Sequence, residues 1–432
     1  LDLATGTGTF LAEVIKQIAP KVKGVAEGMW SGYVERDLIP RIHGFELLMA
    51  SYAMCHMKLD MILTELGYQP TKKNPPRLGV YLTNSLEEGE PANQTLPFAR
   101  WLSDEVREAN TIKRDMPIMC VIGNPPYNPS SQNNSPWIRD QVSIYKEGLN
   151  ERKINLDDDY IKFLRLAEIF VEKNGSGVVG MITNNSFLTG VTHRRMRQHL
   201  LETFNSIYVL DLHGDSNKLE TAPDGSKDEN IFDIQQGVSI IILIKTNNDK
   251  KITDVYHIDS HGKRDSKNDL LWSLNNACSK WAKIIPTTPY YFFDQRSSKG
   301  EKKYSRGIKV TEFFLNYNTG IQTKRDALCL QGTLDAINSI KDDLFELDTE
   351  AFRSKHNLVK DNRDWSIKGA RTDLEINKPI PIRILHRPFD IKYTFFTGKS
   401  KGFLGYPREK TMRHMLIGDN IALLFGRQNK SG

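Results

Sequence analysis

The feature that most constrains this chain is an apolar stretch that ends in a stiff, proline-rich turn. Residues 119–122 read Met-Cys-Val-Ile, and Gly-Asn-Pro-Pro-Tyr follows at 123–127. A short apolar run that stops at glycine predicts a buried strand. Each proline restricts its own backbone and that of the residue before it, so the turn presents an amide, backbone carbonyls and an aromatic ring. These groups suit a planar amine, although a simple strand-ending turn has a similar composition.

Three expected strands precede this one, and each ends beside residues suited to a ligand. Residues 1–8 read Leu-Asp-Leu-Ala-Thr-Gly-Thr-Gly, which predicts the end of a strand and a glycine-rich turn before a helix. The strand at 42–46 ends at Glu46, which is placed either to bind ribose hydroxyls or to serve as an acid at a helix N-terminus. The strand at 79–83 is followed by Asn84.

The alternation of strands and helices predicts an α/β fold with a doubly wound, Rossmann-like sheet. Further strands are expected at 177–182, 206–212 and 236–244. After about residue 245 the strand–helix repeat does not return, and aromatic and basic residues become frequent from 286. We therefore predict two domains, 1–285 and 286–432, of which the second is a mixed α/β domain.

Composition narrows the class of protein without identifying a partner. The net charge of +6 over 432 residues permits a polyanionic partner but does not require one. The four cysteines show no metal-binding spacing, so no metal site is predicted, and a reducing cytoplasm is expected. No apolar run approaches the length of a membrane span. The chain starts without Met, in the middle of a strand, and we expect it to be a piece of a longer polypeptide.

The turn at 2–10 and the turn at 124–127, in this order, resemble the signature of adenine-N6 DNA methyltransferases of the γ order. The segments at 236–238, 318–323 and 387–391 extend the resemblance to the methyltransferase and target-recognition part of type ISP restriction–modification enzymes. Two motifs in the expected structural context are more specific than either alone. Leu3 departs from the family, which usually has proline there.

The resemblance implies S-adenosylmethionine as the cofactor. In such a site Asp2 and the following turn hold the methionine end, Glu46 binds the ribose hydroxyls, and Asn84 with Leu86 contacts the cofactor adenine. The implied cofactor-binding residues are Asp2, Ala4, Thr5, Gly6, Gly8, Phe10, Glu46, Asn84 and Leu86. Because most of the first strand is absent, we expect this piece of the chain to bind the cofactor poorly by itself.

The implied catalytic residues are Asn124, Pro125, Pro126 and Tyr127. An exocyclic adenine amine is a poor nucleophile because its lone pair is delocalised into the ring. The Asn124 side-chain oxygen and the Pro125 carbonyl would accept its two N–H bonds, and no metal is needed. Tyr127 would stack on the base after it leaves the duplex. Phe232 is a candidate for a second stacking face, with a core aromatic as the alternative.

The resemblance also implies double-stranded DNA as the partner. The expected DNA-binding residues are Lys324, Arg325, Arg387, Lys392, Arg408 and Arg427, although basic surface loops look similar in many proteins. The basic residues at 194–199 suit either phosphates or a solvated helix face. Relatives carry a nuclease and an ATP-dependent translocase upstream on the same polypeptide. A non-catalytic recognition module, or an RNA or protein amine acceptor, is the alternative function.

Overall fold

The chain forms two compact units in the computed structural model, Leu1–Ser297 and Ser298–Gly432. The division lies beyond the boundary predicted at 285/286. The structure describes residues 1–25, 27–89, 100–151, 154, 156–247, 252–274, 280–296, 300–314, 316–418 and 420–424. Within these ranges no helix combines the length and the apolar character that a membrane crossing requires.

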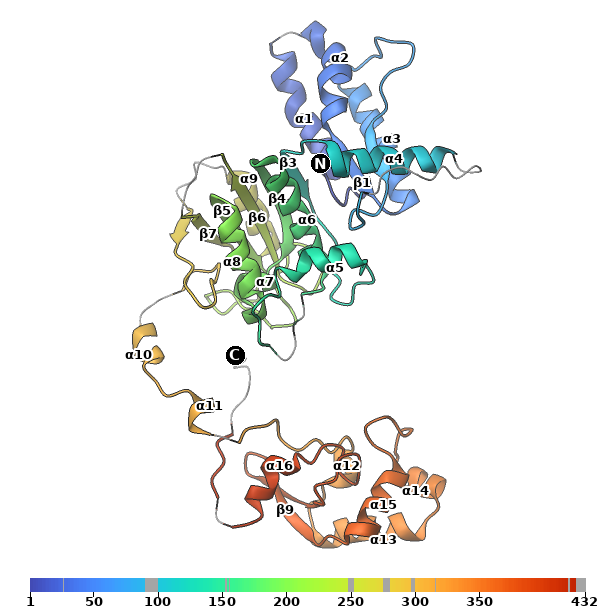
Figure 1. The fold of residues 1–432 in the computed structure, drawn as a ribbon, viewed down its shortest axis with the longest axis vertical. Helices are drawn as coiled ribbons and strands as arrows, with labels where there is room; N and C mark the ends of the chain where they lie inside the picture. Colours follow the sequence, from blue (N-terminus) through green and yellow to red (C-terminus); the bar gives the residue numbers. More distant parts are fainter. Residues whose placement is uncertain are drawn as a thin grey trace. The chain divides into compact units, whose positions relative to one another are not determined.

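A mixed sheet runs through the first unit (Figure 1). Its strands are β1 (His43–Glu46), β2 (Gly79–Leu82), β3 (Cys120–Gly123), β4 (Gly177–Asn184), β5 (Ser206–His213), β6 (Val238–Lys245), β7 (Asp254–Asp259) and β8 (Ala282–Ile284). Residues 1–3 join β1 to β3, because Asp2 pairs in parallel with both Gly44 and Ile122. The order is therefore β2-β1-(1–3)-β3-β4-β6-β5-β7-β8, with β6 and β8 antiparallel to their neighbours.

Helices cover both faces of this sheet. They are α1 (Thr9–Lys23), α2 (Trp30–Tyr33), α3 (Met49–Glu65), α4 (Arg100–Asp115), α5 (Pro136–Ser143), α6 (Asp159–Asn174), α7 (Ser186–Thr189), α8 (Arg194–Thr203) and α9 (Arg264–Ser273). Short 3-10 or π turns lie at Glu27–Met29, Val34–Leu38, Ile39–Arg41 and Val191–His193. Neighbouring strand residues point to opposite faces, so Val80 packs with α1 and α3 while Tyr81 packs with α4 and α6. This confirms the predicted doubly wound α/β fold.

The strand order reverses between residues 1–3 and β3. The chain leaves residues 1–3 through α1, which lies on one face, and leaves β3 toward α5 and α6 on the other face. Ligands of open α/β sheets bind outside the carboxyl ends of the strands at such a switch point. The turn at 4–8 and the residues at 124–127 both leave the sheet at this place.

A buried arginine explains why the first unit extends past residue 285. Arg197 on α8 is 0% exposed, and its guanidinium donates to the carbonyl oxygens of Tyr290 (2.6 Å), Tyr291 (2.9 Å) and Gly190 (2.9 Å). Phe293 is buried in the main core of the sheet. The segment that follows β8 therefore packs onto the first unit and does not belong to the second.

The second unit has its own core and is described by itself. It contains α10 (Glu301–Ser305), α11 (Val310–Phe313), α12 (Asp326–Cys329), α13 (Leu334–Glu346), α14 (Thr349–Lys355), α15 (Ile367–Asn377), α16 (Glu409–Met412), a 3-10 turn (Arg413–Met415), and the strands β9 (Pro381–Arg387) and β10 (Asp390–Phe395). The strands form an antiparallel hairpin. Trp365, Phe352, Phe395 and Phe403 are each at most 1% exposed and form the centre of this core.

Candidate functional site

The glycine-rich turn is built around the buried side chain of Asp2. One carboxylate oxygen of Asp2 accepts a hydrogen bond from the backbone N–H of Ala4 at 3.1 Å. The other oxygen is buried and has no hydrogen-bond partner among the described residues. Burial raises the pKa of Asp2 from 3.8 to about 7. A buried carboxylate oxygen without a donor is suited to a cationic amine.

Two positions near this turn, Gly8 and Gly123, require glycine because a neighbouring side chain comes too close for a Cβ atom. Gly8 has φ +80°, and a Cβ there would lie 2.6 Å from the Cys55 sulfur of α3. A Cβ on Gly123 would lie 2.9 Å from the nearer Asp2 carboxylate oxygen. These contacts bring α1 against α3 and bring the end of β3 against Asp2. The N-terminus of α1 therefore starts directly beside the site, with Phe10 half-buried in its first turn.

Glu46 lies at the end of β1 and supports the same turn. Its two carboxylate oxygens accept hydrogen bonds from the backbone N–H groups of Gly6 and Leu48, both at 2.8 Å. The side chain of Thr5 donates to the Phe45 carbonyl at 3.1 Å. Each Glu46 oxygen keeps a second lone pair, so the carboxylate can still accept hydrogen bonds from a diol.

Asn84 closes a turn after β2 instead of pointing freely outward. Its side-chain oxygen accepts from the backbone N–H of Leu86 at 3.0 Å, and its amide nitrogen donates to Glu87 at 3.1 Å. The Leu86 side chain is 1% exposed and packs in the main core. The buried amine of Lys113 donates to the Asn84 carbonyl at 2.7 Å, and burial lowers the pKa of Lys113 to about 8. Lys113 of α4 thus holds the turn after β2 in place.

Asn124 follows β3 directly and is exposed, whereas Pro125 is buried. The Asn124 side chain makes no hydrogen bond with any described residue, and neither does the Pro125 carbonyl. The strand before it is fixed on both sides, because Ile122 pairs with Asp2 and with Gly180 of β4. The two acceptors that the sequence predicts as an amine clamp are therefore held on a rigid strand end with their lone pairs available.

Tyr127 is half-buried and packs edge-on against Tyr160 of α6, with ring centroids 5.9 Å apart and planes at 77°. Its hydroxyl is buried without a hydrogen-bond partner among the described residues. Burial, together with nearby Asp158, raises the pKa of Tyr127. The contact fixes the orientation of the ring at the end of the turn. Its role in base stacking stays a prediction.

Hydrogen bonds tie the segment after Tyr127 to α6 and to the turn before it. The Lys162 amine of α6 donates to the Ser131 hydroxyl (2.9 Å), the Asn133 carbonyl (2.6 Å) and the Asn134 side chain (3.0 Å). The backbone N–H of Asn128 donates to Asp158 at 2.7 Å. A lysine in an otherwise apolar helix pattern was the available signal, since a buried lysine needs acceptors.

Phe232 lies in the segment 214–237, which leaves β5 and returns into β6 at the same carboxyl edge of the sheet. The ring is 36% exposed, and its backbone N–H is bound by Asn230 at 2.9 Å. Asn185, which follows β4, holds the end of this segment by donating its backbone N–H to the Gly237 carbonyl at 2.9 Å. Phe232 is therefore placed outside the core, although its stacking role remains a prediction.

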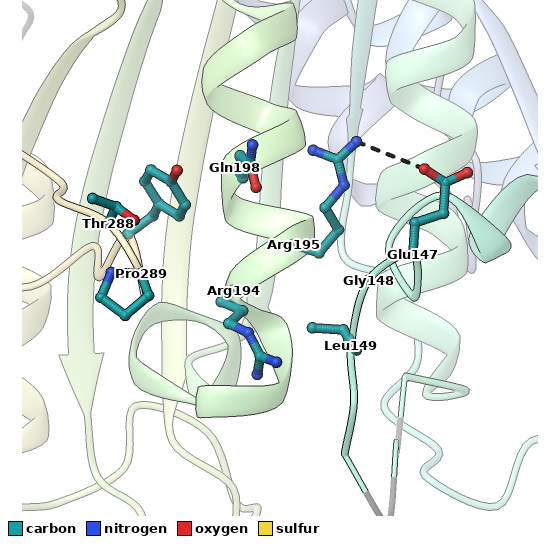
Figure 2. A pocket seen from close by; sticks show the side chains of 9 residues that line it. Glu147, Gly148, Leu149, Arg194, Arg195, Gln198, Thr288 and Pro289 are labelled. Carbon is teal, nitrogen blue, oxygen red and sulfur yellow. Dashed lines mark ion pairs between the residues drawn. The ribbon is translucent and has the colours of Figure 1, made fainter.

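A cavity of about 410 Å³ lies away from these residues, between α8, the segment after α5 and the segment around Pro289 (Figure 2). Arg194 pairs with Glu151 at 2.8 Å, and Arg195 pairs with Glu202 at 3.2 Å and faces Glu147 across the cavity in Figure 2. With Arg197 buried, the basic residues of α8 are engaged by the protein itself. None of the predicted cofactor or catalytic residues lines this cavity.

Four of the predicted DNA-binding residues form two pairs in the second unit. Lys324 and Arg408 both lie over the Tyr406 ring, each 5.3 Å from its centroid. Arg387 and Lys392 belong to the β9–β10 hairpin, whose tip carries the fully exposed Phe389.

Arg325 is held by other residues of the second unit. Its guanidinium lies over the Trp365 ring, 5.1 Å from the centroid, and donates to the Lys360 carbonyl at 3.1 Å. Arg427 lies outside the described residues. The DNA contacts of all six residues stay predictions.

Comparison with known proteins identifies two domains. Residues 58–218 match the Eco57I restriction-modification methylase family, and residues 312–432 match the Type ISP C-terminal specificity domain. The chain thus carries a methylase domain followed by a Type ISP specificity domain, as the resemblance in the sequence predicts. A search of curated proteins gave no match.

Solved structures share the fold of nearly the whole chain. The ATP-dependent Type ISP restriction-modification enzyme LlaBIII bound to DNA is 23% identical, with a TM-score of 0.65 over 93% of this chain and 27% of that one. A DrdV–DNA complex is 22% identical, with a TM-score of 0.62 over 94% of this chain and 41% of that one. A nuclease-deletion mutant of the Type ISP enzyme LlaGI with a DNA substrate mimic is 20% identical, with a TM-score of 0.60 over 91% and 34%. This chain therefore spans less than half of each of these proteins.

Proposed function

We propose that this chain, with its methylase domain and its Type ISP specificity domain, transfers a methyl group from S-adenosylmethionine to the N6 amine of an adenine in a specific DNA sequence. The observation that carries the proposal is the position of Asn124. Its amide is exposed, unbonded to described residues and fixed at the end of β3, at the switch point beside the glycine-rich turn.

The residues around the turn suit this cofactor. The unpartnered oxygen of Asp2 is suited to the cofactor's ammonium group, and the backbone at 4–8 runs past it. Glu46 has lone pairs left for the ribose hydroxyls. When bound, the cofactor supplies an electrophilic methyl group on a sulfonium.

Asn124 and Pro125 provide the activation of the acceptor. A hydrogen bond from the target amine to the Asn124 side-chain oxygen, and a second to the Pro125 carbonyl, draw both N–H bonds out of the plane of conjugation. The nitrogen lone pair would then be localised and directed at the methyl group that the bound cofactor supplies. A fixed pair of neutral acceptors stabilises the positive charge that develops on this nitrogen. Tyr127 and Phe232 would hold the flipped base by stacking.

DNA is the proposed substrate, and the second unit is proposed to select the sequence. Its exposed hairpin with Arg387, Phe389 and Lys392 offers groups that can reach base edges or phosphates. We place the reaction in the cytoplasm. The full-length polypeptide is proposed to carry a nuclease and an ATP-dependent translocase as well, since Type ISP enzymes such as LlaBIII are ATP-dependent.

The decisive variant is Asn124→Ala in the full-length polypeptide, with labelled cofactor and mixed-sequence duplex DNA. We expect methyl transfer to fall at least about 1,000-fold, while cofactor and DNA binding change little. Asn128→Ala is the matched control, because Asn128 is exposed four positions along the same segment and its side chain accepts one hydrogen bond from the described residues, from the backbone N–H of Ser130. That control should keep nearly full activity.

Chromatography of the digested product identifies the modified base. N6-methyladenine is expected, whereas N4-methylcytosine would overturn the adenine assignment. Transfer to RNA or protein in preference to duplex DNA would overturn the substrate class. Full activity of Asn124→Ala would overturn the mechanism, and absence of cofactor binding would favour a non-catalytic recognition module.

A further inference from the structure

A second group of chemically active side chains lies at the same edge of the sheet, on β5 and β7. These strands pair in parallel with Asp211 opposite Asp259. Residues two apart on a strand point to the same face, so His257 and Asp259 share a face with Asp211. Leu210, Leu212 and Ile258 point the other way and pack with the side chains of α9. Strand register, and not a sequence motif, thus brings these three groups together.

Three ligand atoms converge in this group. One oxygen of Asp259 lies 3.5 Å from Nδ1 of His257. The atoms that Asp211, His257 and Asp259 offer all lie within 4.8 Å of one another. Ligand atoms about 2.0–2.2 Å from a tetrahedral zinc ion lie about 3.4 Å apart. The 3.5 Å between His257 and Asp259 matches this spacing.

Of the three side chains, His257 alone lacks a hydrogen bond with the described residues. Its side chain is 0% exposed, and neither ring nitrogen has a hydrogen-bond partner among the described residues. A buried imidazole without partners is costly, because both nitrogens lose their bonds to water. A metal ion satisfies one of these nitrogens directly.

His213 and His261 surround the three ligands. Nε2 of His213 lies 2.9 Å from the second Asp259 oxygen, and the His213 and His261 rings stack at 3.9 Å with planes at 17°. One Asp211 oxygen accepts a hydrogen bond from the Asn185 side chain at 3.0 Å, and the other lies 3.7 Å from Nδ1 of His213, beyond hydrogen-bond distance. Supporting bonds of this kind orient the ligands of metal sites.

We propose that Asp211, His257 and Asp259 bind a divalent transition-metal ion of the zinc class, with water as the fourth ligand. One imidazole and two carboxylates are a ligand set that zinc accepts. The ion ties the end of β5 to the end of β7 directly before Gly214, where the segment carrying Phe232 begins. The site is structural, lies apart from the proposed methyl-transfer residues, and does not depend on that function.

The test measures metal uptake by the full 432-residue chain. After removal of metals by a chelator and dialysis, the protein is titrated with Zn²⁺ against a chromogenic competitor, and then with Co²⁺. We expect one high-affinity equivalent and the visible absorption bands of tetrahedral Co²⁺. Asp259→Asn should weaken Zn²⁺ binding about 100-fold or more and remove the bands.

Two further variants keep the test independent of folding. His257→Gln should behave as Asp259→Asn, and circular dichroism verifies that both variants are folded. His356→Gln is the control, because His356 contacts a single carboxylate, Asp343, at 3.0 Å in the second unit. It should retain wild-type Zn²⁺ affinity. Wild-type protein that binds Zn²⁺ no more tightly than Asp259→Asn would overturn the proposal.

Discussion

Two regions at the carboxyl edge of one sheet differ in how their polar groups are used. At the switch point, Asn124 is exposed in the turn that follows β3, and Asp2, on the strand residues 1–3 just before the glycine-rich turn, keeps one oxygen unpartnered among the described residues. On β5 and β7, side chains of Asp211, His213 and Asp259 point mainly at one another from the strands themselves. The first arrangement is open to an organic ligand that brings its own donors. The second suits a single small ion. Groups at a strand end next to a turn keep atoms free for a ligand, whereas groups on two strands in register face one another.

The largest expected effect concerns the support beneath the switch-point turn. Lys162→Met removes the amine that holds Ser131, Asn133 and Asn134 and leaves those acceptors unpaired. We expect a loss of about 3 kcal/mol in the free energy of unfolding, measured by denaturant titration, and faster proteolysis within 128–135.

A second lysine provides the control for this experiment. Lys146→Met removes a partly exposed pair with Asp157, at 2.7 Å, and should cost less than about 1 kcal/mol. Equal losses of unfolding free energy in the two variants would show that Lys162 does not hold the segment beside Tyr127. The contrast between this segment and the cluster on β5 and β7 would then be weaker.

The next effect isolates the unpartnered oxygen of Asp2. In the full-length polypeptide, Asp2→Asn keeps the shape and the bond from Ala4 but removes the negative charge, so cofactor affinity should fall about 100-fold by calorimetry, or about 2.7 kcal/mol. The stability of the cofactor-free protein at pH 8 should not fall. A folded-state pKa of about 7, above the usual 3.8, means that ionised Asp2 disfavours the fold as pH rises between these values. Unchanged affinity would remove Asp2 from the cofactor site.

The smallest effect is a pH dependence of cofactor binding. The switch-point region should impose it through Asp2, and the cluster on β5 and β7 should not. Below about pH 7 Asp2 is protonated in the free protein and must release its proton before it pairs with an ammonium group. Cofactor affinity should therefore rise about tenfold per pH unit as pH increases toward 7 and then level off. Asp2→Asn should flatten this profile, whereas Asp259→Asn should leave it intact. A flat profile in the wild-type protein would contradict the assignment.

The sequence predicts Asn124 because it stands between Gly123 and Pro125 at the end of an apolar run, and it predicts Asp2 because a glycine-rich turn follows shortly after it. The fold follows from the same signals, since strand and helix alternate with short turns. Other features depend on packing that a single sequence does not display. Arg197 reads as a surface arginine among basic neighbours, yet it is buried against backbone carbonyls and draws the segment after β8 into the first unit.

The cluster on β5 and β7 shows where such prediction stops. Asp-Leu-His at 211–213 and His-Ile-Asp-Ser-His at 257–261 are separated by more than forty residues and by a strand that pairs with only one of them. Alternate polar residues on a strand are usually a solvated face. Only the parallel register places Asp211 opposite Asp259. Because the sequence does not display this register, it predicts no metal site.

The most direct test of the central claim is a map of modified bases in cells that express the full-length gene. Genomic DNA from cells with the wild-type gene and from cells with Asn124→Ala is sequenced by a method that detects methylated bases. The account predicts N6-methyladenine at one recurrent sequence in the first sample and its absence in the second. Recurrent methylation that persists in Asn124→Ala, or no recurrent methylation with the wild-type gene, would contradict it.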